Sequence, residues 1–495
     1  MDKENLNGIP EEEKEEIIIC SRCGANEAMQ GSEYCEQCEA QLLKKKIPFF
    51  GWVAGFVSLM LSVVVTIVML SGTVLTSGLS KGDKYADEKS WHTAYEQYYN
   101  EYKESVASLN VINDLLNRVF ETEERAYVSP SLGIKKKMIN VVANYYGPLD
   151  AYYYATGFLS ENEMAMPFMK NYEKMYLDFQ TTYQAAEATF NKAFEENADY
   201  KTVLAEMDTH KGKDGVNEVF LNYHKYVISV NLGASVSEQN AILEDIRKAA
   251  EASGDDYGWL LNPVMSQAHY DAGEIDEAMA CLDKIIDSNK SNYDAYRLKM
   301  RLQVKSGDIQ AAGETVAEFR AANENCEFTY YADVLEIEYL RITGDYDKAK
   351  ALCIEADESY KKIPEDNGIF DLIYMIEGKY VMPTEIYRQR ALVSMITEDY
   401  ADAFNTMMEA YQMESYYAQY FQGSANLNDP NFYGALYLSA NLLSSSGQMT
   451  EESKPDVDIV LSMFSEGAMS KDIEAIINGE KTAKEVLTEG EFELV

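Results

Sequence analysis

Residues 266–286, "SQAHYDAGEIDEAMACLDKII", contain the pattern that decides the fold of this chain. The segment reads as a helix, a tight turn, an apolar residue, an alanine and a second helix. The same order recurs at residues 301–319, 338–356 and 391–410. Successive turns lie 34, 37 and 54 residues apart. Self-similarity at such a period indicates stacked helix pairs that bury a continuous core between neighbours.

Three landmarks in each copy give the pattern its physical meaning. A glycine permits the tight turn, an apolar side chain fills the gap behind it, and a small alanine lets the second helix approach the first. The turn positions are Gly273, Gly307, Gly344 and, as the fourth equivalent, Glu398. The apolar positions are Ile275, Ile309, Tyr346 and Tyr400, and the alanines are Ala278, Ala312, Ala349 and Ala403.

These copies resemble tetratricopeptide repeats, which carry a Gly-Asp-Tyr turn, an alanine three residues after the tyrosine and another alanine seven residues later. Ala356 and Ala410 match the last alanine, whereas Ile285 and Phe319 replace it in the first two copies. Tyr296 or Tyr387 stands where the family has a tryptophan, and the 54-residue step implies an insertion around residues 366–382.

The resemblance implies a solenoid whose concave face holds a peptide or protein segment. First helices line that face in the family, so we expect their outward positions to be exposed here. These positions are Gln267, Asp271, Arg297, Arg301, Glu338, Arg341, Gln389 and Ser394.

Toward the N-terminus, residues 47–80 contain no charged side chain, and residues 49–70 are the most apolar part. About 20 consecutive apolar residues suffice to span a bilayer core as a helix. A cleaved signal peptide has a shorter apolar region that starts nearer the N-terminus. We therefore expect residues 47–79 to contain one transmembrane helix. Gly51 and Gly55 fit a small-xxx-small pattern, which would allow a homodimer through this helix.

The basic residues that flank this segment predict its orientation. Lys44, Lys45 and Lys46 come directly before it, whereas Lys81, Lys84 and Lys89 follow more spread out among acidic residues. Lysines and arginines concentrate on the cytoplasmic side of membrane helices. We expect a cytoplasmic N-terminus in the cell membrane and an extracytoplasmic C-terminal region.

Four cysteines precede the membrane segment as two CxxC pairs: Cys20, Cys23, Cys35 and Cys38. Each pair can present two thiolates on one side, and two such pairs facing each other suit tetrahedral zinc with no open position. A redox CxxC would need a larger preceding domain, and two disulfides would need an oxidising compartment. The spacing predicts a structural zinc site.

Residues 20–42 resemble the short zinc-ribbon domains found before a basic patch and one membrane helix in many bacterial proteins. Gly24 matches the glycine after the first pair, and Tyr34 matches an aromatic residue before the third cysteine. Glu39 departs from the glycine that usually follows the second pair. The resemblance implies a cytoplasmic zinc-ribbon, which could serve as a folded stop or as a docking point for a partner.

Composition limits the remaining functions. A net charge of −40 argues against nucleic acid and anionic lipid headgroups as partners. The four histidines do not fall at metal-site or catalytic-triad spacing, and no phosphate-binding loop or hydrolase motif is present. We expect a protein-binding scaffold rather than an enzyme. One alternative is a glycan or cell-wall binder that uses tyrosine clusters such as Tyr152, Tyr153 and Tyr154, and another is an enzyme with an unrecognised acidic site.

The sequence therefore predicts a mostly α protein with a small zinc-ribbon, one transmembrane helix and an α-helical solenoid. The expected segments are an acidic flexible N-terminus (1–19), the zinc-ribbon (20–43), the transmembrane region (47–79), a helical region of unphased repeats (81–258), tetratricopeptide-like repeats (259–415) and a C-terminal helical cap (416–495).

Overall fold

A computed structural model describes the chain in two compact units that divide between residues 74 and 75. The described residues are 18–25, 27–29, 32–43, 79–120, 132–195, 198–378, 380–420, 429–464 and 470–488. The expected acidic N-terminus, apart from its last two residues, and the expected transmembrane segment up to residue 78 lie outside this set, as do Gly51 and Gly55 of the dimer pattern. Within it, no helix combines the length and the apolar character that crossing a bilayer requires.

The N-terminal unit contains two cysteine turns and one helix. Residues Ile19 and Glu27 form an antiparallel bridge that closes the first turn. The second turn leads directly into helix α1 (Glu36–Leu43). A segment this short buries little apolar surface, so its fold depends on the four cysteines that it brings together.

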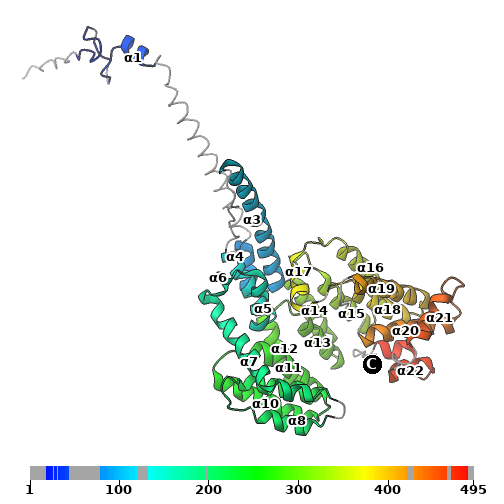
Figure 1. The fold of residues 1–495 in the computed structure, drawn as a ribbon. Coiled ribbons are helices and arrows are strands. Elements are labelled where there is room, and N and C mark those ends of the chain that lie inside the picture. Colours follow the sequence, from blue (N-terminus) through cyan, green and yellow to red (C-terminus); the bar gives the residue numbers. More distant parts are fainter. Residues whose placement is uncertain are drawn as a thin grey trace, which may run out of the picture. The chain divides into compact units, whose positions relative to one another are not determined.

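The second unit consists of helices throughout its described residues, which confirms the mostly α fold (Figure 1). Four helix pairs cover the predicted repeats, and the two members of each pair contact each other. The pairs are α11 (Gly258–Asp271) with α12 (Ile275–Ser288), α13 (Tyr293–Lys305) with α14 (Ile309–Ala322), α15 (Tyr330–Ile342) with α16 (Tyr346–Tyr360), and α18 (Thr384–Ile396) with α19 (Tyr400–Tyr420).

The turn of each pair has the backbone that the sequence pattern demands. Gly273, Gly307 and Gly344 adopt φ values of 76°, 84° and 86°. Glu398 occupies the fourth turn with φ 61°, a left-handed conformation that costs a residue with a side chain about 1–2 kcal/mol. Gln448 supports this turn, because its side-chain amide donates to the Glu398 carbonyl at 2.8 Å.

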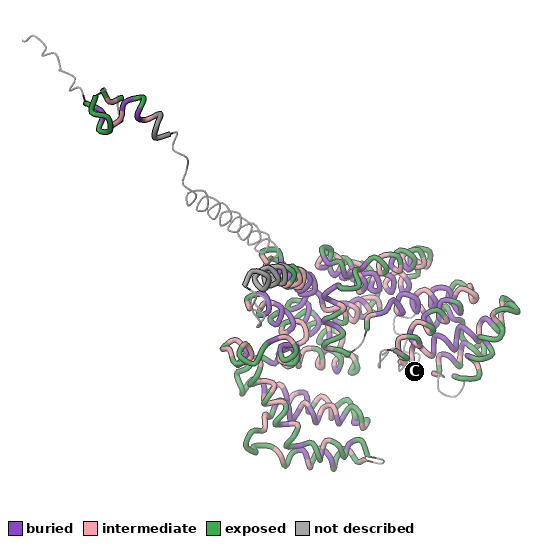
Figure 2. Tube along the Cα trace, turned by 45° about the horizontal axis from the view of Figure 1, so that its top comes forward, coloured by how far each residue is buried: buried purple, intermediate pink, exposed green. Residues whose placement is uncertain are grey.

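The predicted alanines pack between the helices. All four alanines that follow the turns are fully buried, and Ala356 and Ala410, seven residues farther along their second helices, are buried as well. Tyr296 and Tyr387 are buried where the family has tryptophan. Figure 2 shows how buried and exposed positions alternate along these helices.

Helix α17 (Gly368–Glu377) accounts for the long step between the third and fourth pairs. After α19, the chain adds α20 (Pro430–Ser446), α21 (Lys454–Phe464), α22 (Lys471–Ile477) and α23 (Ala483–Thr488). Helix α20 packs on α19 and α18, whereas α23 contacts α18 and α15. The last described helix therefore returns to the first helices of the third and fourth pairs.

The region before the repeats is also helical. A stretch over residues 79–87 is followed by α3 (Trp91–Phe120), α4 (Leu132–Tyr145), α5 (Pro148–Phe158), α6 (Glu161–Met164), the 3₁₀ helix η1 (Pro167–Met169), α7 (Lys170–Lys192), α8 (Tyr200–Asp208), α9 (Glu218–Asn231) and α10 (Val236–Ser253). Helices α9 and α10 pack as a pair, and α10 contacts α11. The solenoid packing thus begins before residue 259.

Helix α3 fastens this region to the connections between helix pairs. The Trp91 indole donates to the Ser288 carbonyl at 2.8 Å, and the His92 amide donates to Ser291 Oγ at 3.1 Å. Farther along, Glu96 accepts from the Glu327 amide at 2.8 Å and from Asn367 Nδ2 at 2.6 Å. One helix therefore contacts three successive connections, which joins regions far apart in sequence.

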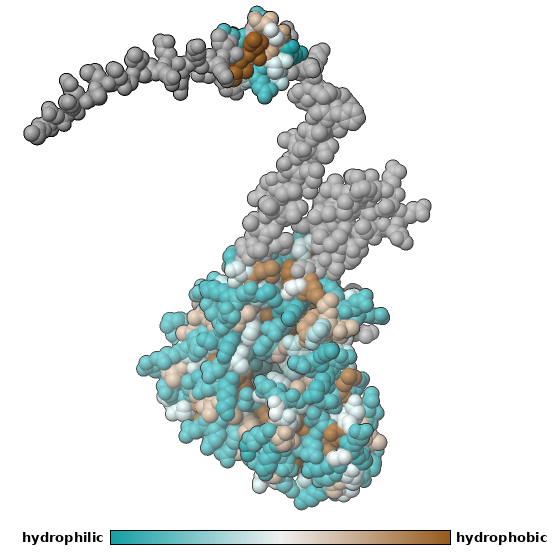
Figure 3. All heavy atoms as spheres, turned by 90° about the vertical axis from the view of Figure 1, so that its left-hand side faces the viewer, coloured by the Kyte–Doolittle hydropathy of each residue, from teal (hydrophilic) through white to brown (hydrophobic). Residues whose placement is uncertain are grey.

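The surface of this unit agrees with its acidic composition. Residues 81–495 contain 72 acidic and 37 basic side chains. Figure 3 shows that the face turned toward the viewer is largely hydrophilic across this unit. The apolar residues lie mainly between the helices, as a stacked α-helical array requires.

Candidate metal centre and first-helix face

The four predicted metal ligands lie together in the N-terminal unit. Their sulfur atoms are within 4.8 Å of one another, and Sγ of Cys23 and Sγ of Cys35 are 3.8 Å apart. Four sulfurs at about 2.3 Å from a tetrahedral zinc ion would be separated by about 3.8 Å. All four thiols are free of disulfide bonds. This donor set and spacing fit zinc, and Cys20, Cys23, Cys35 and Cys38 are the residues that would hold it.

The two cysteine turns differ in backbone, which explains why Glu39 replaces the usual glycine. Gly24 ends the first turn with φ 65°, and its amide donates to the Cys20 carbonyl at 3.0 Å. In the second turn, the amides of Cys38 and Glu39 both donate to the Cys35 carbonyl, because α1 begins at Glu36. A right-handed helical backbone accepts any side chain, so Glu39 is compatible with a metal-binding turn.

The turns give the cysteines unequal acidities. A hydrogen bond from the backbone of Cys23, with another from Cys35, lowers the pKa of the Cys20 thiol to about 6. Burial raises the pKa of Cys38 to about 12. A metal ion binds thiolates and releases their protons, so metal affinity at this site would fall as the pH is lowered.

In the second unit, the first helices of the last three pairs contact one another in succession. Helix α13 contacts α15, and α15 contacts α18. We call the outward positions of α11, α13, α15 and α18 together the first-helix face. Gln267 and Asp271 on α11 are exposed on it, as the sequence predicts. Arg297 and Arg301 on α13 retain 25% and 20% of their side-chain exposure.

The other half of the first-helix face differs from the prediction. Glu338, Gln389 and Ser394 are fully buried, and Arg341 is 2% exposed. The expectation that these positions are open was wrong, because neighbouring helices cover them: α23 lies against Arg341, the arginines of α13 contact Glu338, and Ser394 donates to Asp402 of α19 at 2.6 Å. We call these positions on α15 and α18 the covered half. Ala483, Val486 and Leu487 of α23 are buried in the same apolar cluster as Tyr387 and Ala391 of α18. The Arg341 guanidinium donates through Nη1 to the Leu487 carbonyl.

The covered half contains an ion cluster centred on Glu338. Arg297 Nε donates to Glu338 Oε2 at 2.6 Å, and Arg301 donates to the other oxygen. Burial alone would raise the pKa of Glu338, but the three arginines at 297, 301 and 341 outweigh it and lower the pKa to about 2. Glu338 is therefore ionised at neutral pH, which a buried carboxylate requires opposite charge to sustain.

Two further residues complete the cluster, and sequence reasoning missed them. Arg388 makes a two-point contact with Glu385, with Nε to Oε2 at 2.7 Å and Nη2 to Oε1 at 2.6 Å. Gln389 joins the parts, since its amide donates to Glu385 at 2.9 Å and its oxygen accepts from Arg341 Nε at 2.9 Å. The only signal in the sequence was the group of charged residues Glu385, Arg388 and Arg390 within six positions. In the structure, most residues of this helix, α18, are buried.

The cluster brings four arginines to two glutamates, an excess of positive charge inside a strongly acidic protein. Arg341 directs its guanidinium at a backbone carbonyl in the last turn of α23. Unpaired carbonyls give the C-terminal end of a helix partial negative charge. The covered half therefore combines an apolar floor with a cationic group that recognises the end of a short helix.

No family model and no curated protein matches the chain. In a solved structure of Naa15/Naa10 bound to HypK-THB, one chain is 11% identical with a TM-score of 0.30, covering 82% of this chain and 72% of that one. The crystal structure of yeast Tom70 is 12% identical with a TM-score of 0.27, covering 83% of this chain and 99% of that one. These values are too low to carry an argument about partners or activity.

Proposed function

We propose that this chain is a membrane-anchored scaffold whose first-helix face binds a helical segment of a partner protein. The observation that supports it best is α23, a short helix that already lies on this face. It buries Val486 and Leu487 there and receives a hydrogen bond from the buried Arg341 at its C-terminal end. A surface that accommodates one amphipathic helix has the shape and the polar group to accommodate another. Gln267 and Asp271 extend the same face beyond the part that α23 covers.

The anchor and the metal centre belong to the same proposal. The uncharged residues 47–80, with Lys44, Lys45 and Lys46 before them, favour a single membrane helix with the C-terminal unit outside the cytoplasm. In the reducing cytoplasm, the four cysteines would remain free of disulfide bonds and could bind a structural zinc ion as thiolates, releasing their protons. Digestion of residues 79–495 by a protease added outside intact cells would support this topology, and complete protection would contradict it.

The proposal assigns binding and no catalysis, which follows from the lack of a catalytic motif in the sequence. A photoreactive phenylalanine analogue at position 267, on the first-helix face, tests it in cells. We expect a discrete cross-linked partner that an excess of competing partner peptide removes. The matched control places the same group at Glu277, which is exposed on the second helix of the same pair. Equal cross-linking from both positions would contradict the assignment of the face.

A further inference from the structure

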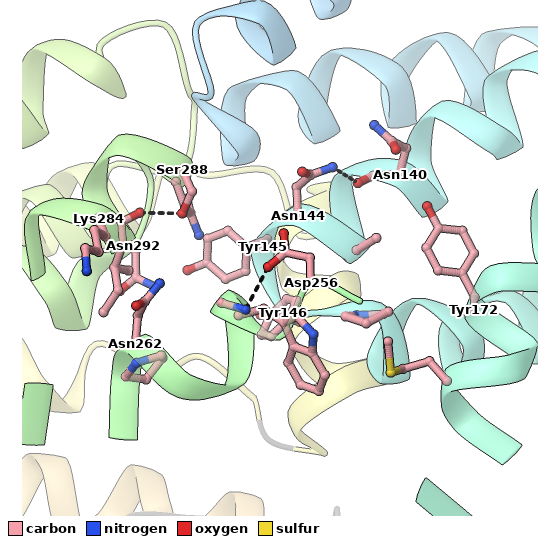
Figure 4. A pocket seen from close by; sticks show the side chains of 18 of the residues that line it. Asn140, Asn144, Tyr145, Tyr146, Tyr172, Asp256, Asn262, Lys284, Ser288 and Asn292 are labelled. Atoms are coloured by element: carbon pink, nitrogen blue, oxygen red, sulfur yellow. Dashed lines mark hydrogen bonds between the residues drawn. The ribbon is translucent and has the colours of Figure 1, made fainter. Parts of the chain in front are cut away.

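A cavity of about 920 Å³ lies between α4 and α7 on one side and the start of α11 with the end of α12 on the other. Figure 4 places Asn140 and Tyr172 across the cavity from Lys284 and Asn292. This volume is in the range of sites that enclose a small organic ligand. Since α3 and the α4–α5 turn hold the two sides together, the cavity is part of the folded unit.

Flat aromatic rings form much of the cavity lining. The rings of Tyr293 and Tyr331 stack with centroids 4.8 Å apart and an angle of 17° between their planes. The rings of Tyr145 and Tyr146 meet edge to face at 4.6 Å. Packing between rings fixes their orientation, so they form rigid surfaces. The apolar face of a pyranose ring, with its C–H groups directed outward, complements such surfaces.

Trp259 owes its place in this lining to a glycine. Gly147, between α4 and α5, has φ 113°, and a Cβ built on it would lie 2.6 Å from Trp259 Cε3. Only glycine allows both this backbone and this approach. The indole therefore rests on the α4–α5 turn and spans the two sides of the cavity. Its Nε1 is buried without a hydrogen-bond acceptor among the described residues.

Side-chain amides supply most of the neutral polar groups. Six asparagines line the cavity: Asn140, Asn144, Asn171, Asn262, Asn289 and Asn292. Each amide offers both donors and an acceptor, which matches the dual character of a sugar hydroxyl. Asn289 is 2% exposed, and its oxygen accepts from the Ser291 amide at 3.0 Å. Its Nδ2 has no acceptor within the described part of the chain, so it has a donor to offer a ligand.

The charges at the cavity disfavour an anionic ligand. Asp255, Asp256, Asp294 and Glu377 line it, against two lysines. Lys174 is already paired with Asp255 at 2.7 Å, and Glu377 accepts from the Tyr146 hydroxyl at 3.0 Å. A phosphate, nucleotide or uronic acid would meet a net negative site. A neutral ligand, or one with amino groups, would not.

We propose that this cavity is a binding site for a neutral or amino-bearing oligosaccharide. The Tyr293–Tyr331 pair and Trp259 would stack on the sugar rings, and the asparagine amides would bind the hydroxyl groups. The cavity is lined by the first residues of α11, α13 and α15 and by none of the eight outward positions named for the first-helix face, so it is a second binding activity. It differs from the glycan surface that the tyrosine run suggests in the sequence, because Tyr154 is buried and Tyr153 lies outside the cavity.

Titration calorimetry of the full chain tests this assignment with five probes: maltotetraose, chitotetraose, the deacetylated chitosan tetramer, tetragalacturonate and tetralysine. We expect at least one of the first three to bind, and tetragalacturonate to bind at least about tenfold more weakly. Asn262→Ala should weaken that binding by about fivefold to tenfold, the cost of one lost hydrogen bond. Trp259→Phe should remove any ligand-induced change in tryptophan fluorescence.

Asn171→Ala provides a second cavity variant at an exposed position, where folding is least affected. Tyr153→Ala is the matched control, since Tyr153 is 59% exposed and outside the cavity. Circular dichroism should show that all variants keep the helical fold. The proposal is overturned if none of the first three probes binds, or if binding survives the cavity variants and disappears in Tyr153→Ala. Tighter binding of tetralysine or tetragalacturonate, lost in the same variants, would overturn the ligand class.

Discussion

The two halves of the first-helix face follow one repeat pattern and yet have different environments. On α11, Gln267 and Asp271 are exposed to solvent. On α15 and α18, the equivalent positions are buried, with Arg341 against α23, and the charges are arranged in a cluster around Glu338. The difference shows that the turn and alanine positions determine how the helices pair. The solvent exposure of the outward side chains depends instead on which other parts of the chain pack against them. A buried charged side chain needs an oppositely charged partner, whereas an exposed one is stabilised by water.

The metal centre belongs to the other compact unit, so a change there should leave both halves of the first-helix face unaltered. Removing the metal with a strong chelator should unfold residues 18–43, since structural zinc contributes about 10–16 kcal/mol to folding of such small domains. Both halves of the first-helix face should be unaffected. Zinc content by atomic absorption and helicity by circular dichroism measure the two effects. Full retention of structure at the N-terminus without metal would contradict a structural zinc role.

The largest difference between the halves should come from removing one charge from each. Glu338→Ala leaves Arg297, Arg301 and Arg341 without their shared carboxylate, and we expect the free energy of unfolding to fall by about 3–5 kcal/mol. Asp271→Ala, on the open half, should change it by less than about 0.5 kcal/mol. Urea denaturation measures both. Similar losses for the two variants would show that the halves do not differ as described.

Lowering the pH should reduce the free energy of unfolding through the Glu338 carboxylate of the covered half. The pKa of Glu338 is lowered from an ordinary value of 4.5 to about 2 in the folded chain, so the unfolded chain takes up its proton first. The contribution of the ionised Glu338 to the free energy of unfolding is present above pH 4.5. It is lost as the pH falls toward 2, at about 1.4 kcal/mol per pH unit and about 3 kcal/mol in total. Glu338→Gln should flatten the stability profile in this window. An unchanged profile would contradict the pairing.

The smallest effects should come from the turns, one in each half. Gly307→Ala places a side chain at φ 84° in the pair α13–α14, and we expect a loss of about 1–2 kcal/mol. Glu398→Gly relieves the left-handed backbone of the pair α18–α19 and should stabilise the chain by up to about 1 kcal/mol. Thermal unfolding compares the two. A destabilised Glu398→Gly variant would mean that its side chain, rather than Gln448 and the backbone, supports this turn.

The helix pairs could be predicted from the sequence because their requirements are local. A glycine seven residues after Met300 and an alanine five residues after the glycine place a turn and a helix contact without knowledge of anything distant. The four cysteines were likewise predictable, since the spacing within each pair creates the turn. Glu39 shows the limit of a motif, because the helical backbone at this position forms the second cysteine turn without the glycine that zinc-ribbon domains usually have there.

Other features depended on contacts that spacing cannot reveal. The covering of Arg341 by Leu487 joins residues 146 positions apart, and the contact of Asn367 with Glu96 joins residues 271 apart. Neither partner has a local pattern that indicates the other. The cavity could not be predicted for the same reason, because Trp259 and Gly147 come from separate regions of the sequence. In the tyrosine run at residues 152–154, Tyr154 packs inside the fold, where its hydroxyl group and that of Tyr95 form a hydrogen bond.

The most direct test of the account is whether the first-helix face binds a helix supplied from outside. A fluorescent peptide of residues 470–488 would be titrated into the chain with Leu487→Asp, which should detach α23, and into the Ile459→Asp control, whose position is 52% exposed. We predict saturable binding to the detached chain, at least about tenfold weaker binding to the control, and loss of binding when Arg341→Ala is added. No binding to the detached chain, or binding that ignores Arg341, would contradict the central claim.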